Sequence, residues 1–340
     1  MQWKNKIIAL LIAMVAIGYT PAQDLHFSQY FNTPMLVNPA NTGFNPDYSY
    51  RIGGNYRNQW ANVGNPYKTM SLWGDAKLLT DRFENGWIGV GASLLKDAAG
   101  SGSLTATSAF GSIAYHQLLG YNSLLSGGFS VGYTSKRIDI SKLSFDNQWN
   151  GRFFDQTVPS NEPFAYSQVG YLDLQMGLNY AYFASDKVYF NAGVSIMHIN
   201  TPRESFFDPG VSDNRIPRRY TAFINGSIKL QDIWILNPNL YVSKMGNAWE
   251  TVIGFNANRD LTGDGMNQLI VGLYYRNNDA LIPMMGYQVN DLKFTVNYDA
   301  TVSTLGNING SRGAYEISIV KSGVFPSSAG KTVKCPTVRF

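Results

Sequence analysis

Alternation of side-chain character with a period of two residues is the feature that most constrains this fold. Between Tyr48 and Trp60, even positions carry mainly Tyr, Ile and Trp, whereas odd positions carry Ser, Arg, Asn and Gln. The same alternation returns at 125–134 and at 292–301. Successive side chains of a β-strand point to opposite faces, so this period indicates strands. Repeated segments of about ten residues, apolar on one face and small or polar on the other, are typical of transmembrane β-barrels.

Fourteen segments follow this pattern, and we predict an all-β fold, a single antiparallel barrel of about fourteen strands. The predicted strands are 48–60, 66–79, 84–97, 103–119, 122–136, 168–183, 187–199, 218–231, 233–246, 248–259, 267–276, 279–288, 291–300 and 313–321. A soluble β-sandwich also alternates along its strands. The number of strands, the leader described below and the low charge favour the barrel.

The lengths of the connections support this count. The long connections, at about 138–167, 200–217 and 301–312, all follow odd-numbered segments, whereas those after even-numbered segments are mostly tight. Short periplasmic turns and long outer loops alternate in this way in outer-membrane barrels. The segment Asp260–Gly265 faintly resembles a calcium-binding loop, but Val271 stands where the closing Glu belongs, so we predict a turn.

Composition excludes several other classes of protein. Charged residues make up 15% and aromatic residues 14% of the chain, which is unlike a disordered protein. The formal net charge is +4, and removal of Lys4 and Lys6 with the leader leaves about +2, too little for a nucleic-acid-binding surface. The single cysteine, Cys335, excludes a disulfide within the chain.

The N-terminus has the features of an export signal. Lys4 and Lys6 precede an apolar run of about eleven residues, and small residues at Thr20-Pro21-Ala22 provide a cleavage site. We predict cleavage after about Ala22, so that the mature chain begins at Gln23 and resides in the bacterial outer membrane. Four parts follow: a signal peptide at 1–22, a plug at 23–47, the barrel at 48–321 and a periplasmic tail at 322–340.

The segment 23–47 cannot form a long helix or a central strand, because Pro34 and Pro39 disfavour both. Irregular backbone at membrane depth must be buried in protein or line a watery cavity. A plug inside the barrel satisfies this condition, as a moving hatch or as a static filler. The strand parity predicts that the plug and the tail both begin on the periplasmic side. The expected plug residues are Phe27, Tyr30, Phe31, Pro34, Asn38, Pro39 and Ala40.

A series of motifs along the mature chain, beginning in the plug and ending in the tail, carries a family resemblance. The matching motifs are Gln23–Tyr30, Asn38-Pro39-Ala40 with Gly43, Asn55–Trp60, Ile138–Phe145, His198–Pro202, Pro217–Thr221, Asp279–Ile282 and Cys335-Pro336 followed by Phe340. In this order they resemble the PorP/SprF family of type IX secretion system membrane proteins, over essentially the whole mature chain. The tail departs from the family's Cys-Pro-x-Phe ending, because two extra residues separate Pro336 from Phe340.

The resemblance implies a non-enzymatic component of a secretion and gliding apparatus. Such a protein would accompany a secreted adhesin-type cargo and associate with the type IX secretion machinery. The tail residues Cys335, Pro336 and Phe340 would dock that machinery. The family also resembles fatty-acid-transporter barrels, which share an Asn-Pro-Ala sequence, so uptake of hydrophobic small molecules is the alternative function.

The loop at 138–167 is the candidate surface for a partner. It carries the aromatic residues Phe145, Trp149, Phe153, Phe154, Phe164 and Tyr166 among several Asn and Gln residues. Exposed aromatic residues favour binding, although the loop could instead fold over its own aromatic side chains. The basic run Arg215, Arg218 and Arg219 would meet lipopolysaccharide phosphates or form a solvated rim.

No residue pattern indicates an enzyme, a metal site or a cofactor. The three histidines, His26, His116 and His198, lie in different predicted elements, and no metal-ligand spacing or nucleophile motif occurs in the sequence. We therefore expect no catalytic residues, no cofactor and no nucleic-acid partner.

Overall fold

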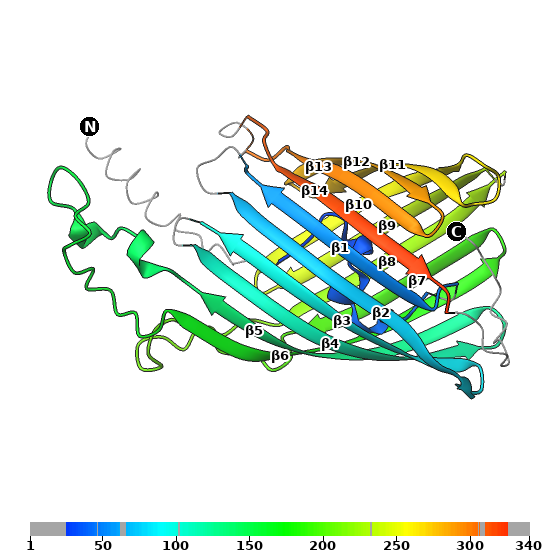
Figure 1. The fold of residues 1–340 in the computed structure, drawn as a ribbon, viewed down its shortest axis with the longest axis horizontal. Helices are drawn as coiled ribbons and strands as arrows, with labels where there is room; N and C mark the ends of the chain where they lie inside the picture. The colour runs from blue at the N-terminus through cyan, green and yellow to red at the C-terminus, as the bar shows by residue number, and fades with distance from the viewer. Residues whose placement is uncertain are drawn as a thin grey trace, which may run out of the picture.

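The computed structural model describes residues 25–45, 47–61, 66–100, 103–231, 233–304, 306 and 310–325. The described residues form fourteen strands in one closed antiparallel barrel (Figure 1). The strands are β1 (Tyr50–Gln59), β2 (Tyr67–Phe83), β3 (Gly86–Ala99), β4 (Leu104–Leu119), β5 (Ser123–Arg137), β6 (Gln168–Ser185), β7 (Val188–Met197), β8 (Arg219–Leu230), β9 (Trp234–Met245), β10 (Ala248–Asp260), β11 (Asn267–Arg276), β12 (Ala280–Val289), β13 (Leu292–Thr301) and β14 (Ala314–Gly323).

The barrel closes between its first and last strands. The pairing runs from Tyr50 opposite Gly323 to Gln59 opposite Ala314, so neither strand is left as an edge. The predicted all-β barrel is confirmed, with strand ends shifted by a few residues. The largest shift is in β2, which continues to Phe83 because the register with β3 slips between Leu78 and Phe83. Leu79 there has a φ of 56°, a conformation uncommon for this residue type.

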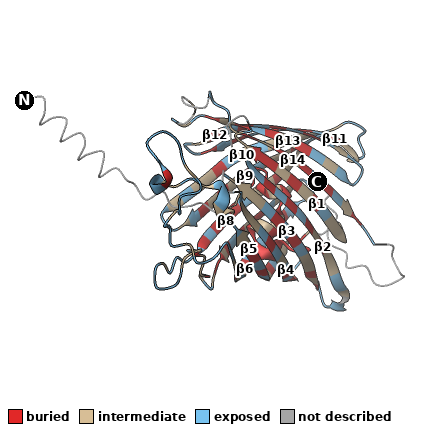
Figure 2. Ribbon diagram, turned by 60° about the vertical axis from the view of Figure 1, so that its left-hand side comes forward, coloured by how far each residue is buried: buried red, intermediate tan, exposed pale blue. Residues whose placement is uncertain are grey.

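The barrel wall has an apolar outer face and a polar inner face. Along β1, Ile52 is 53% exposed on the outside, whereas Asn55 and Arg57 are buried inside. Figure 2 shows buried residues recurring along the strands of the wall. The buried inner face includes Ser, Thr, Asn and Gln side chains on strands around the barrel. This arrangement inverts that of a soluble protein and is the one a barrel needs in lipid.

The two ends of the barrel differ in their connections. The long connections 138–167, 198–218 and 302–313 lie at one end, here called the loop side, where the green loop 138–167 projects beyond the strands (Figure 1). The opposite end, the turn side, has short connections such as 120–122 and 290–291, and Gly120 and Asn290 have positive φ angles there. Among the described residues, no helix is both long enough and apolar enough to cross a membrane.

Residues 25–45, here called the lumenal segment, lie inside the barrel. The segment contains η1 (Tyr30–Asn32), the single helical turn α2 (Pro34–Val37) and η2 (Pro39–Asn41). Each proline is the first residue of its turn, where the missing N–H has no intrahelical partner to lose. The prolines therefore start short turns and prevent one long helix.

The direction of the lumenal segment differs from the prediction. The Leu25 carbonyl accepts a hydrogen bond from Arg219 Nη1 at 3.1 Å, and Arg219 is the loop-side residue of β8. At the other end of the segment, Gly43 lies against Ala76 and Gly89, near the turn side. The described chain therefore runs from the loop side to the turn side, where β1 begins. The prediction that the segment begins on the periplasmic side was wrong. Strand parity gives the side on which β1 begins, which is where the segment ends, and it does not give the side on which the segment begins.

The predicted leader 1–22 and the tail residues Cys335, Pro336 and Phe340 lie outside the described residues. The described part of the C-terminal segment ends at Phe325, whose ring centroid lies 5.3 Å from that of Tyr50 at the turn side. The predicted tail therefore starts beside the first strand.

Candidate functional site: the lumenal segment and its anchors

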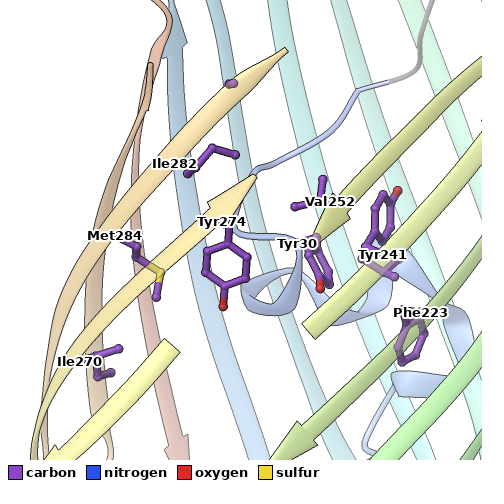
Figure 3. Packing of buried hydrophobic residues seen from close by; sticks show 10 residues of the cluster. Tyr30, Phe223, Tyr241, Val252, Ile270, Tyr274, Ile282 and Met284 are labelled. Carbon is purple, nitrogen blue, oxygen red and sulfur yellow. The ribbon is translucent and has the colours of Figure 1, made fainter. Parts of the chain in front are cut away.

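Aromatic stacking holds the first turn of the lumenal segment against the wall. The ring centroids of Tyr30 and Tyr241 lie 4.7 Å apart, and those of Phe31 and Tyr274 lie 5.4 Å apart. Figure 3 shows Tyr30 on the lumenal segment between the strands that carry Tyr241 and Tyr274. Such pairs contribute about 0.5–1.5 kcal/mol each beyond the area they bury.

The Asn38-Pro39-Ala40 turn packs directly on the inner wall. A Cβ atom on Gly128 of β5 would lie 2.4 Å from the Ala40 nitrogen, and one on Gly177 of β6 would lie 2.0 Å from Asn38 Oδ1. Both distances are too short for any side chain, so only glycine allows this approach. The predicted residues Asn38, Pro39 and Ala40 are all buried at this contact.

The Asn38 side chain ties this turn to two neighbouring strands. Its Nδ2 donates to the carbonyls of Leu178 in β6 and Val194 in β7, at 2.9 and 3.2 Å. Its Oδ1 accepts from the Ala40 N–H at 2.8 Å, which fixes the following turn. Ser195 Oγ donates to the Val37 carbonyl at 2.7 Å. Because one amide serves both wall and turn, Asn38 positions the whole contact.

A buried charge cluster anchors the start of the lumenal segment. The Ser28 and Gln29 N–H groups donate to the two carboxylate oxygens of Glu316, at 2.7 and 3.0 Å. Ser28 Oγ donates to Asp299 Oδ2 at 2.6 Å, and Arg57 Nη1 bonds to Asp299 at 2.9 Å and also to Glu316. We call Arg57, Arg276, Asp299 and Glu316, from β1, β11, β13 and β14, the charge cluster; Arg276 Nη2 lies 3.0 Å from Asp299 Oδ2.

A second anchor lies toward the turn side. Asp75 Oδ2 accepts from the Gly43 N–H at 2.7 Å, and Arg51 pairs with the same carboxylate. Arg51 Nη2 also donates to the Asn41 carbonyl at 2.9 Å. His116 lies 2.7 Å from the Thr42 carbonyl through Nε2 and 2.7 Å from Ser126 Oγ through Nδ1. Both ends of the lumenal segment are thus fixed by buried polar contacts.

A cavity of about 230 Å³ remains between the lumenal segment and the loop-side wall. Its apolar lining includes Leu25, Phe27, Leu95 and Met197, and its polar lining includes Lys136, Tyr171, Asp173, His198 and Glu204. Glu204, from the 198–218 loop, pairs with Lys136 and accepts from Tyr171 Oη at 2.9 Å. His198 Nδ1 lies 3.0 Å from Asp173 Oδ1. The 198–218 loop is therefore fastened over this cavity.

The aromatic residues of the 138–167 loop divide into two groups. Phe145 and Phe164 are half-buried, and the Phe164 ring stacks on Phe207 of the 198–218 loop with centroids 5.0 Å apart. The exposed residues are Trp149, Phe153, Phe154 and Tyr166. Trp149 and Phe154 pair across a short bridge, with centroids 5.1 Å apart. The loop thus has internal structure and still presents aromatic rings outward.

The basic run does not act as one surface. Arg219 points into the barrel and bonds to Ser243 Oγ at 2.8 Å, because it lies on the inner face of β8. Arg218 is exposed and donates from Nε to the Ile199 carbonyl at 3.1 Å, and exposed Arg215 pairs with Asp213 at 3.1 Å. Both interpretations of this run, a lipopolysaccharide contact and a solvated rim, are therefore wrong for Arg219.

The calcium-like segment is a turn, as predicted. The Asp260 carboxylate accepts the N–H groups of Thr262, Gly263 and Gly265, so it is occupied by the turn itself. Among the described residues, no group of three or more His, Cys, Asp or Glu side chains is placed to hold a metal ion.

Sequence reasoning missed the charge cluster and the Arg51–Asp75 anchor. The signal was present: ionisable residues stand on the polar face of predicted strands in a chain with few charges. Ionisable groups inside a membrane protein are costly and mark functional or structural sites. The sequence could not show which of them meet, because they come from strands far apart in the chain.

A family model, "Type IX secretion system membrane protein PorP/SprF", matches residues 20–320. The match includes the lumenal segment and nearly all of the barrel. The chain belongs to the PorP/SprF family. The resemblance expected from the ordered motifs is confirmed, and the protein is an outer-membrane component of a type IX secretion system.

Solved barrels share the fold of this PorP/SprF protein. A deltaS2S3 mutant of the TodX monoaromatic hydrocarbon channel superposes with a TM-score of 0.51 at 12% identity, covering 85% of this chain and 93% of that one. The Pseudomonas putida toluene transporter TodX gives 0.50 at 11% identity, covering 85% and 92%. At such identities the likeness concerns the fold alone. No curated protein sequence matches the chain.

Proposed function

We propose that this PorP/SprF protein is a non-enzymatic anchor that holds a secreted adhesin-type cargo at the cell surface and docks the secretion machinery. The observation that carries the proposal is the family match over residues 20–320. Family membership implies association with other components of the secretion system. We assign the cargo to the loop side of the barrel and the machinery to the turn side.

The lumenal segment occupies the inside of the barrel, which supports an anchor rather than a protein channel. The lumenal segment is stacked on the wall by Tyr30 and Phe31 and fixed by buried ion pairs. A folded or extended cargo chain would have to break these contacts to pass. We therefore place the predicted plug residues Phe27, Tyr30, Phe31, Pro34, Asn38, Pro39 and Ala40 in a static seal.

The loop side supplies the proposed capture surface. Trp149, Phe153, Phe154 and Tyr166 expose aromatic rings from a loop ordered by its own hydrogen bonds, and Phe153 is 56% exposed. Aromatic anchors dominate the energetics of protein interfaces. Half-buried Phe145 and Phe164 serve the loop itself and would support the surface from below.

The turn side carries the proposed docking element. The described chain ends at Phe325, whose ring lies beside Tyr50 at the turn side. We assign the tail residues Cys335, Pro336 and Phe340 to this side as part of the proposal. These three residues would bind a periplasmic partner, in which Cys335 could form an intermolecular disulfide. Cleavage after Ala22 belongs to this proposal as well, and N-terminal sequencing of the mature protein tests it.

The test compares co-purified proteins from outer membranes in mild detergent, with and without reductant. Wild-type protein should recover one large secreted adhesin and secretion-ring proteins. Phe153→Ser with Phe154→Ser should lose the adhesin and keep the ring proteins, whereas Cys335→Ser should do the reverse. Tyr121→Ser, at a 91% exposed turn-side aromatic residue, is the control for exposed rings. Unchanged export and surface retention of every cargo in a gene deletion would refute the proposal.

Uptake of hydrophobic small molecules is the second candidate. The loop-side cavity of about 230 Å³ favours it, because Leu25, Phe27, Leu95 and Met197 make part of its wall apolar. The TodX structures, described as a monoaromatic hydrocarbon channel and a toluene transporter, have a similar fold. A growth defect of the deletion strain on hydrophobic carbon sources, with normal adhesin display, would favour this function. Substitution Met197→Trp would then reduce uptake by filling the cavity.

A further inference from the structure

An apolar recess crosses the outer face of the barrel wall. Its volume is about 960 Å³, four times that of the loop-side cavity, and its lining is almost entirely apolar. It lies over strands β3 to β10, on the face that carries exposed Leu, Ile, Val and Phe side chains. It therefore opens toward the membrane and not toward the lumen.

Two small residues create the depth of this recess. One cross-strand row of outward residues runs Tyr115, Gly127, Leu178, Val194, Ala222 and Val242 on successive strands β4 to β9. The row beside it runs Ile113, Phe129, Met176, Ile196, Tyr220 and Lys244. Gly127 and Ala222 interrupt the first row among large side chains, so the surface is hollow there.

The recess runs obliquely across the wall, from near the turn side to the loop side. Tyr115 lies near the turn-side end of β4, whereas Lys244 and Trp249 lie at the loop-side ends of β9 and β10. Lys244 Nζ is 4.9 Å from the Trp249 ring centroid, and among the described residues this ammonium group has no ion-pair or hydrogen-bond partner. Tyr220 completes an aromatic border at this end.

We propose that this recess binds lipopolysaccharide, with acyl chains over Gly127 and Ala222 and a lipid A phosphate at Lys244. Charge and position together favour this occupant. A lysine with an aromatic border at the loop side stands where headgroups of the outer leaflet lie. The remainder of the recess offers only apolar contacts, which acyl chains satisfy. The inference is independent of the proposed cargo function and concerns a different face of the molecule.

The same strands carry the lumenal segment on their other face. Gly127 faces the recess, and the next residue, Gly128, faces the Asn38-Pro39-Ala40 turn. Bound acyl chains and the lumenal segment would thus lie on opposite sides of a wall that is thinned by glycine. The lipid would cover the thin part of the wall.

The experiment measures lipid A and phospholipid per barrel, by mass spectrometry of protein purified from outer membranes in mild detergent. Gly127→Leu and Ala222→Leu place a side chain in the recess, and at Gly127 a Cβ meets only Leu178 Cδ2, at 3.6 Å. Gly111→Leu is the matched control, because Gly111 also lies on the exposed face, outside the recess, with no atom within 4 Å of its Cβ position. Lys244→Gln tests the phosphate contact.

Wild-type and Gly111→Leu proteins should retain lipid A, whereas Gly127→Leu and Ala222→Leu should retain about tenfold less, because contact with a few methylene groups is lost. Lys244→Gln should lower lipid A retention and leave zwitterionic phospholipid unchanged. Equal lipid A in all variants overturns the proposal. Retention of phospholipid alone overturns the choice of lipopolysaccharide, and loss of a protein instead of lipid A from the Gly127→Leu preparation assigns the recess to a protein interface.

Discussion

Two adjacent glycines of β5 face opposite sides of the barrel wall. Gly127 faces the membrane and Gly128 faces the lumenal segment. A Cβ on Gly128 would meet the backbone of Pro39 and Ala40 at 2.4 Å, whereas one on Gly127 has ordinary contact distance. The same substitution at both positions therefore distinguishes two effects on stability. At Gly128 it tests packing against the lumenal segment, and at Gly127 it tests strand propensity alone.

We expect Gly128→Ala to destabilise the protein by about 1–3 kcal/mol, because the lumenal segment must shift to make room. Gly127→Ala should change the free energy of unfolding by less than about 1 kcal/mol, as a gain in strand propensity without a clash. Urea unfolding in detergent micelles, followed by tryptophan fluorescence, measures both. Equal effects of the two substitutions would show that the Asn38-Pro39-Ala40 turn does not press on β5.

The charge cluster makes a second prediction at this scale. Arg57→Met leaves Asp299 and Glu316 buried, at 2% and 1% exposure, without their shared cation, and should cost about 3–5 kcal/mol. Arg259→Met, which removes an exposed arginine beside Trp234, should cost less than about 1 kcal/mol. Heat-dependent mobility on gels compares the two. Arg57→Met combined with Glu316→Gln should recover part of the loss, and a fully additive double variant would argue against a shared network.

At the scale of elements, two long loops form one unit. Phe164 stacks on Phe207, and the N–H groups of Ala165 and Tyr166 both donate to the Phe206 carbonyl at 3.0 Å. Glu204 fastens the second loop to Lys136 on the barrel. The capture surface proposed on the first loop therefore depends on the second.

Phe207→Ser should release both loops, because it removes a stacked pair worth about 0.5–1.5 kcal/mol and the packing beneath it. Limited proteolysis of intact cells should then cut 138–167 and 198–218 several times faster. Phe153→Ser, at an exposed ring of the first loop, should leave the cleavage rate unchanged. If cleavage accelerated only in the 198–218 loop, the two loops would be independent.

At the scale of the whole molecule, the barrel and its content are separable. Every strand pairs with two neighbours, including β1 with β14, so the hydrogen-bonded ring is complete without the lumenal segment. A barrel of this size can hold an open passage when it is not filled. We therefore propose that the lumenal segment closes the pore.

Deletion of residues 25–45 should therefore leave a folded barrel that conducts ions, whereas the wild-type protein should be silent in planar bilayers. Deletion of 146–158 from the outer loop should leave the barrel both folded and silent, as a control for shortening the chain. Mobility of the unheated protein on gels reports folding. A folded deletion variant without conductance would show that other residues seal the lumen.

Local order along the chain was enough to predict the barrel. Period-two alternation assigns each side chain to lipid or lumen, and a single antiparallel wall with short turns on one side follows from local order along the chain. Phe27, Tyr30 and Asn38 were predicted inside for the same kind of reason, since proline-broken backbone must be buried within the barrel.

The contacts of these residues could not be predicted from the sequence, because they join strands that are far apart in the chain. Arg57, Arg276, Asp299 and Glu316 come from four strands, and closure of the ring brings β14 back to β1 and places them around Ser28. The direction of the lumenal segment, the inward turn of Arg219 and the recess over Gly127 likewise depend on which strands face each other across and along the wall. Periodicity gives the side of the wall a residue faces; the partner on that side is set by registers and closure, which act between residues far apart in the chain.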